Sequence, residues 1–143
     1  MKKIFLINSL SSIAELYKDY LIIKGYSVEV AHNVGKFYEK LDDYDPDIVI
    51  FDTDMPGSES GKFASLLSSN ECLKKKSLLL LTGFIDEEKI KCFEKMENYQ
   101  FIDKSSTNSQ VLGRVESLLQ YTHPESNGFY RSRVLAEVPG LNS

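Results

Sequence analysis

The stretch Pro46-Asp47-Ile48-Val49-Ile50-Phe51-Asp52-Thr53-Asp54-Met55-Pro56-Gly57 contains a short apolar run that ends abruptly on a carboxylate and then enters a Pro-Gly turn. Apolar runs of this length, rich in Ile and Val and bounded by turn formers, are typical of a strand buried on both faces of a parallel sheet. Open α/β sheets bind their ligands at the carboxyl ends of such strands. Asp52 is therefore placed where chemistry is expected.

Five strand signals alternate with helical patterns along the chain. The strands are expected at about Lys3–Ile7, Ser27–Ala31, Asp47–Asp52, Ser77–Thr82 and Tyr99–Asp103. Between them, apolar residues recur at helical spacing and predict helices whose apolar stripes face the core. These stripes are Ile13, Leu16, Tyr17 and Tyr20, closed by Gly25; Phe37 and Leu41, capped by Asn33; Phe63, Leu66 and Leu67; Ile90, Phe93 and Met96; and Val111, Val115, Leu118 and Leu119.

The alternation of strands and helices predicts a parallel sheet with helices on both faces, since right-handed crossovers must cover it. We expect an α/β fold of the flavodoxin-like, doubly wound kind, with five parallel strands in the order 2-1-3-4-5. In that arrangement the ends of the first, third, fourth and fifth strands meet at one edge. The residues expected at this edge are Asn8, Ser9, Asp52, Thr82 and Lys104.

Length and composition exclude several classes of function. The 143 residues, 42% of them hydrophobic, are enough for one core of ordinary size. The formal net charge of −4 gives no basic field for nucleic acid or an anionic membrane, and no apolar run approaches transmembrane length. Cys72 and Cys92 have no zinc-binding spacing. We therefore expect a cytoplasmic protein with reduced thiols and no contact with nucleic acid or membrane.

The helical pattern stops after Tyr121, so residues 1–121 are predicted to form the domain. Residues 122–143 hold too few apolar side chains for a second domain. One interpretation is a flexible tail. The other is a segment that binds a partner through Phe129, Tyr130 and Val134, or that leads into an effector domain.

The spacing of three residues carries a family resemblance. Asp52 closes the third strand before the Met55-Pro56-Gly57 turn, Thr82 follows thirty positions later, and Lys104 follows twenty-two positions after Thr82. Over residues 1–121 this pattern resembles the receiver domain of two-component response regulators. The resemblance implies that Asp52 accepts a phosphoryl group from a histidine kinase, that Thr82 binds a phosphoryl oxygen, and that Lys104 pairs with the remaining charge, roles that suit these side chains. The competing interpretation is an ion pair of Asp52 and Lys104 at the sheet edge, with the Thr82 hydroxyl only capping the strand end.

The resemblance also implies a switch and an output. Phe101 matches the aromatic residue whose rotation reports phosphorylation in the family, and a core phenylalanine is the alternative. A receiver is not an enzyme: its output would be contact with a histidine kinase or another signalling protein. The sequence leaves the oligomeric state open, a homodimer included.

The first strand departs from the family pattern. Receivers place two consecutive acids after this strand to hold a divalent ion, whereas this chain has Asn8 and Ser9. Because Mg²⁺ draws much of its affinity from carboxylates, we expect weak binding and impaired phosphorylation, as in a pseudo-receiver. Asp52 remains as a metal ligand, and the side chain of Asp54 is a candidate replacement, with a solvated turn acid as the alternative.

Two other functions compete with the receiver. Asp52-Thr53-Asp54 with the later Thr82 and Lys104 also resembles haloacid-dehalogenase-type phosphatases, although Met55-Pro56 stands where these enzymes usually have Gly-Thr. The hydroxyls of Ser9, Ser11 and Ser12 at a helix N-terminus would suit a module that binds phosphate or flavin. No Gly-rich turn that would let the backbone approach a flavin phosphate is found, so helix capping is the competing role for these serines.

Overall fold

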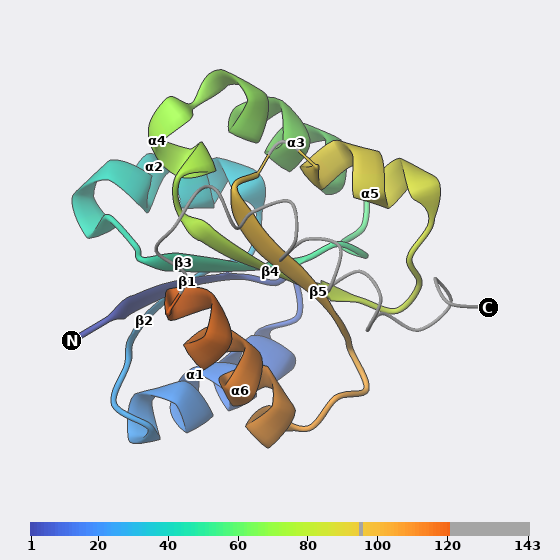
Figure 1. The fold of residues 1–143 in the computed structure, drawn as a ribbon. Coiled ribbons are helices and arrows are strands. Elements are labelled where there is room, and N and C mark those ends of the chain that lie inside the picture. Colours follow the sequence, from blue (N-terminus) through green and yellow to red (C-terminus); the bar gives the residue numbers. More distant parts are fainter. Residues whose placement is uncertain (95, 121–143) are drawn as a thin grey trace.

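A computed structural model of the protein describes residues 1–94 and 96–120, and the tail expected at residues 122–143 lies outside them. The five strands are all parallel and lie in the order β2-β1-β3-β4-β5, as predicted (Figure 1). The strands are β1 (Lys3–Ile7), β2 (Ser27–Ala31), β3 (Ile48–Asp52), β4 (Ser77–Thr82) and β5 (Asn98–Asp103). The helices are α1 (Ser11–Ile23), α2 (Val34–Tyr44), α3 (Glu59–Ser69), α4 (Glu71–Lys74), α5 (Glu87–Phe93) and α6 (Asn108–Leu119).

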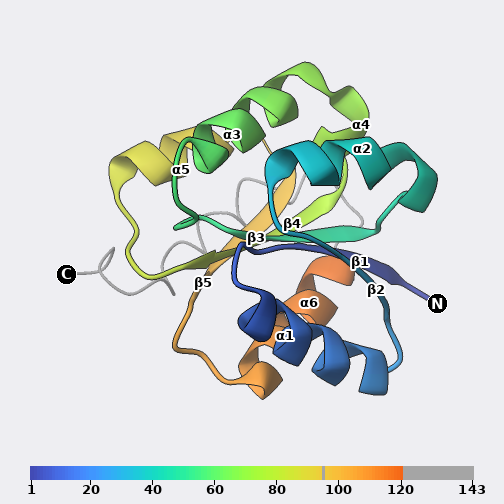
Figure 2. The same ribbon diagram turned by 180° about the vertical axis from the view of Figure 1, so that it is seen from behind.

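The sheet separates two cores. Figure 2 shows α1 and α6 on one face, with α2, α3, α4 and α5 on the other. Successive strand residues alternate between the faces, so Leu6 and Ile50 pack beneath α1 and α6 while Phe5 and Phe51 belong to the opposite core. That second core is rich in aromatic rings: Phe51 stacks on Phe63 of α3 with centroids 4.2 Å apart. Every residue of β3 is buried, as a central strand covered on both faces requires.

The strand bounds agree with the sequence prediction to within one residue. β3 begins at Ile48 and not at Asp47, whose carboxylate accepts the backbone N–H of Lys3 at 2.8 Å. β5 begins one residue early, at Asn98, whose side-chain amide donates to the hydroxyl of Ser77 and to the carbonyl of Leu118, both at 2.8 Å. Side-chain hydrogen bonds are present at both of these strand starts, and apolar patterning does not detect them.

The two helix ends predicted from capping residues are confirmed. Asn33 accepts the backbone N–H of Lys36 at 2.8 Å and begins α2. Gly25 follows the end of α1 with φ +100°, a conformation that side chains disfavour. The short α4 was not predicted; Asn70 caps it by accepting the backbone N–H of Leu73 at 2.9 Å.

The prediction that the α1 stripe faces the core was wrong for two residues. Leu16 is 66% exposed and Ile13 is 40% exposed. Ala14 and Leu21 are the fully buried residues of this helix, and at 100° per residue Leu16 points about 150° away from them. Met96 was placed on the stripe of α5; it is buried, but it lies after that helix has ended.

Within residues 1–94 and 96–120, none of the helices has the length and apolar character that a bilayer crossing needs.

Two leucines of α1 give a matched test of its orientation. Leu21→Ala removes a fully buried side chain and is expected to lower the free energy of unfolding by about 2–5 kcal/mol. Leu16→Ala removes an exposed side chain from the same helix and is expected to change that free energy by less than about 0.5 kcal/mol. Urea denaturation of the two variants measures both quantities, and equal losses would contradict the orientation described here.

Candidate functional site

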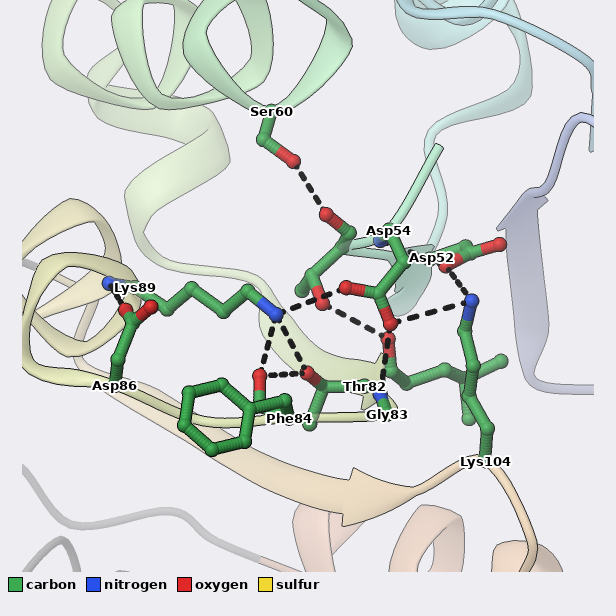
Figure 3. Close-up of polar contacts among 11 residues, drawn as sticks. Asp52, Asp54, Ser60, Thr82, Gly83, Phe84, Asp86, Lys89 and Lys104 are labelled. Carbon is green, nitrogen blue, oxygen red and sulfur yellow. Dashed lines mark hydrogen bonds and ion pairs between the residues drawn. The ribbon is translucent and has the colours of Figure 1, made fainter. Parts of the chain in front are cut away.

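The last residue of β3 brings a carboxylate to the edge of the sheet. Asp52 is only 3% exposed, and its Oδ1 accepts the backbone N–H of Asp54 at 2.9 Å. The same oxygen lies 2.6 Å from the Nζ of Lys104 (Figure 3). A buried carboxylate needs such a partner, because desolvation strongly disfavours an unpaired charge. Asp52 and Lys104, which were both expected at this edge of the sheet, therefore form an ion pair.

Lys104 directly follows β5 and reaches back over the sheet edge. Its backbone N–H donates to the carbonyl of Thr82 at 3.0 Å, which continues the parallel ladder between β4 and β5 by one bond. Partial burial alone would lower the pKa of the Lys104 ammonium. The hydrogen bond to Asp52 and the charges of Asp52 and Asp54 outweigh that effect and raise the pKa above its ordinary value of 10.5.

Asp54 lies in the loop after β3, and both of its carboxylate oxygens are engaged. Oδ2 accepts the backbone N–H of Gly83 at 2.7 Å and lies 3.3 Å from the Nζ of Lys104. Oδ1 accepts the Nζ of Lys89 at 2.8 Å. Burial alone would raise the pKa of Asp54, but the hydrogen bonds from Lys89 and Gly83 and the charge of Lys104 bring it below its ordinary value of 3.8.

Lys89 contributes to this site and was not predicted from the sequence. Its ammonium donates to Asp54 Oδ1, to the hydroxyl of Thr82 at 3.2 Å and to the carbonyl of Phe84 (Figure 3). Asp86 caps α5 by accepting the backbone N–H of Lys89 at 2.9 Å. Since helical side chains point back toward the helix N-terminus, Lys89 reaches the loop before α5. The Asp86 cap three residues earlier was the available signal.

Thr82 ends β4 and is buried. Its hydroxyl donates to the carbonyl of Phe84 at 2.8 Å and accepts from the ammonium of Lys89. Phe84 itself is 68% exposed, so a large aromatic side chain stands on the surface two residues from Thr82. The structure thus connects Thr82 to the acidic loop through Lys89.

A small cavity adjoins Asp52 on the side of the first strand. Its volume is about 80 Å³, and it is lined by Asn8, Leu10, Ile13, Tyr17, Asp52, Leu81 and Lys104. Burial raises the pKa of the Tyr17 phenol, and the charge of Asp52 raises it further. The sequence analysis assigned Ile13 and Tyr17 to the core only, yet both line the approach to Asp52. Asn8 lies at the predicted edge, and Ser9 directly follows it in the chain.

The residues at this edge fit a divalent ion poorly. Receiver domains typically bind Mg²⁺ for phosphorylation, and Asp52 offers one carboxylate of the kind that this ion prefers. The amide oxygen of Asn8, however, accepts the backbone N–H of Leu10 at 2.8 Å, and the Asp54 carboxylate is bound to ammonium groups. Across residues 1–94 and 96–120, no three His, Cys, Asp or Glu side chains gather so that they could hold a metal. Asp54 as a metal ligand stays a prediction.

Phe101 lies on β5 inside the aromatic core. It is 1% exposed and makes edge contacts with Phe93, at a centroid distance of 6.3 Å, and with Tyr99, at 5.8 Å. This placement describes one conformation, in which the ring is buried. A switching role for Phe101 stays a prediction.

The fold is that of a known family. The response regulator receiver domain family matches residues 4–116, and the chain therefore belongs to that family. Receiver domains are generally signalling domains without enzyme activity. Membership favours the receiver over the phosphatase and flavin-binding alternatives, and it places the chain in two-component signalling.

Individual relatives agree with this assignment. Oxygen regulatory protein NreC of Staphylococcus epidermidis is 34% identical over 83 residues, which are 58% of this chain and 38% of NreC, so the chain matches less than half the length of that relative. Chemotaxis protein CheY4 of Vibrio cholerae superposes with a TM-score of 0.74 at 21% identity, covering 82% of this chain and 98% of CheY4. The receiver domain from Bermanella marisrubri gives 0.72 at 22% identity, with coverages of 82% and 98%. Both structures support the fold.

The lowered pKa of Asp54 predicts a pH dependence of stability. A carboxyl whose folded pKa is lowered contributes stability that is present above its ordinary pKa of 3.8 and is lost as the pH falls through the folded pKa. Asp54→Asn is therefore expected to be less stable than the wild type at pH 6, and this difference should shrink below pH 4.

Denaturant unfolding at several pH values between 2 and 6 measures this difference. Asp42→Asn makes the same change of charge at an exposed position of α2 and serves as the control. A difference between wild type and Asp54→Asn that grows as the pH falls would contradict the prediction.

Proposed function

We propose that this chain is an atypical receiver in which Asp52 is the phosphoacceptor, with a histidine kinase as the donor. The observation that carries this proposal is the contact of 2.6 Å between Lys104 Nζ and Asp52 Oδ1 at the carboxyl edge of a receiver-type sheet. In the transfer, a carboxylate oxygen of Asp52 forms a bond to phosphorus while the bond from phosphorus to the donor nitrogen breaks. The electron pair of that bond stays on the donor imidazole. Lys104 offsets negative charge as the acyl phosphate forms.

The side chains around Asp52 support these roles to different degrees. Thr82 ends the neighbouring strand, where its hydroxyl would donate to a phosphoryl oxygen once it releases the carbonyl of Phe84. Lys104 contacts Asp52 directly. Phe101 would report phosphorylation by leaving the aromatic core, which would cost the contacts to Phe93 and Tyr99.

We further propose that Mg²⁺ binds weakly, so that phosphorylation is impaired. Asp52, with Asp54 as a candidate second ligand, would have to hold the ion, because Asn8 and Ser9 stand where two acids would supply negative charge. The amide oxygen of Asn8 is occupied by the N–H of Leu10. Losing two carboxylates removes most of the attraction for a divalent cation.

The output that we propose is contact with another protein. Leu10, Ile13 and Leu16 are 54%, 40% and 66% exposed, and the first two line the cavity beside Asp52. Apolar side chains gathered beside a reactive group suit a helical partner that approaches it. The oligomeric state stays open, a homodimer included. A cytoplasmic location is proposed because response regulators generally act there.

Phosphorylation of Asp52 can be tested by intact mass after incubation with acetyl phosphate. We expect the mass of one phosphoryl group to appear slowly on the wild type and not on Asp52→Asn, with little acceleration by roughly 10 mM Mg²⁺. Labelling of Asp52→Asn at the wild-type rate would exclude Asp52 as the acceptor. Rapid labelling that depends on micromolar Mg²⁺ would refute the proposed impairment.

Restoring the two acids tests the cause of the impairment. Asn8→Asp with Ser9→Asp places carboxylates beside Asp52 and is expected to raise Mg²⁺ affinity by an order of magnitude or more and to speed labelling. Without metal, the clustered carboxylates repel, so the melting temperature in EDTA should fall and recover on adding Mg²⁺. Calorimetric titration and thermal melts measure these effects. If neither the Mg²⁺ affinity nor the labelling rate rises, the cause of the impaired phosphorylation lies in the loop that follows Asp54.

A further inference from the structure

Three donor groups from different parts of the chain converge on the carboxylate of Asp54. They are the backbone N–H of Gly83 at 2.7 Å, the Nζ of Lys89 at 2.8 Å and the Nζ of Lys104 at 3.3 Å (Figure 3). We call these three donors the cradle. One backbone amide and two ammonium groups are the kinds of donor with which proteins bind phosphate.

Lys89 is held in the cradle by its surroundings. An ammonium group has three N–H donors, and Lys89 directs them to three oxygens: Asp54 Oδ1, the hydroxyl of Thr82 and the carbonyl of Phe84. The Asp86 cap fixes the backbone from which the side chain starts. With 23% of its side chain exposed, Lys89 is also partly withdrawn from solvent, which strengthens its interaction with an anion.

The carboxylate of Asp54 occupies the space next to Asp52. The backbone N–H of Asp54 donates to Asp52 Oδ1 at 2.9 Å, and Lys104 contacts both carboxylates. The two acids are therefore matched by Lys89 and Lys104, and the cluster is formally neutral. An oxyanion arriving at Asp52 would need the same donors and would be repelled by Asp54.

The cradle lies where a phosphoryl group proposed on Asp52 would be bound. We propose that Lys89 is an additional contact residue for this oxyanion, and that the carboxylate of Asp54 fills the place of the oxyanion in the resting protein. Lys89 then supplies positive charge that a divalent metal would otherwise supply. Binding of the anion requires no metal, but it requires displacement of Asp54. The biological use of the site rests on the proposed role of Asp52.

The carboxylate of Asp54 is contacted by every donor of the cradle. An ionised carboxylate held by three donors competes with an oxyanion in both charge and geometry. Replacing it by an amide of the same size removes the negative charge and leaves the cradle in place.

The test is a titration with inorganic phosphate in EDTA, followed by the chemical shift of the Gly83 backbone amide. Asp54→Asn is expected to bind phosphate roughly fivefold or more tightly than the wild type, because one close negative charge is removed. Asp54→Ala removes the carboxylate without adding an amide that could disturb the loop, and it should also bind phosphate more tightly than the wild type. Lys89→Met added to Asp54→Asn should abolish the gain. Asp42→Asn, with the same change in net charge on α2, should bind like the wild type.

Two outcomes would overturn the inference: Asp54→Asn and Asp54→Ala both bind phosphate no more tightly than the wild type, or the gain survives Lys89→Met. Labelling of Asp52 by acetyl phosphate is read separately on the same variants. Labelling without tighter phosphate binding would leave the role of Asp52 standing and remove the cradle. Tighter phosphate binding without labelling would support the cradle and remove the proposed role of Asp52.

Discussion

A carboxylate that ends a fully buried strand must be paired with a positive charge, and this constraint organises the site. Asp52 is 3% exposed, and Lys104 lies 2.6 Å from it. Because β4 lies between β3 and β5, pairing these two residues across it also fixes Thr82 at the same edge. The apolar side chains of β3 pack into the cores on both faces of the sheet and hold Asp52 in position. The geometry of the site therefore depends on both cores.

The second carboxylate of the site is paired within the chain. Asp54 is bound by Lys89, Lys104 and the Gly83 amide, so the loops after β3 and β4 are connected by hydrogen bonds within the chain. In a site with two further acids, a divalent cation would balance the charge. Here Lys89 and Lys104 match the charges of the two carboxylates, which reduces the electrostatic attraction for a doubly charged cation.

The fold could be predicted from sequence because apolar runs and helical periodicity are properties of neighbouring residues. The strand order, Asn33 as a cap and Gly25 as a helix end all followed from such patterns. The meeting of Asp52 and Lys104 at one edge was predictable, since Asp52 ends β3 and Lys104 directly follows β5. The orientation of α1 could not be predicted, because a helix with apolar residues on two sides does not reveal which side meets the sheet. Lys89 was missed because its role depends on a side chain that folds back over its own cap, toward residues distant in sequence.

The contact between Lys89 and Asp54 can be tested most directly by a double-mutant cycle. The free energies of unfolding of the wild type, Lys89→Met, Asp54→Asn and the double variant are measured by urea denaturation at pH 7 and low salt. If the two side chains bind each other in the resting protein, the coupling free energy should be favourable by about 0.5 kcal/mol or more and should fall as salt is added. A coupling of zero within error would contradict the presence of this ion pair at the centre of the site.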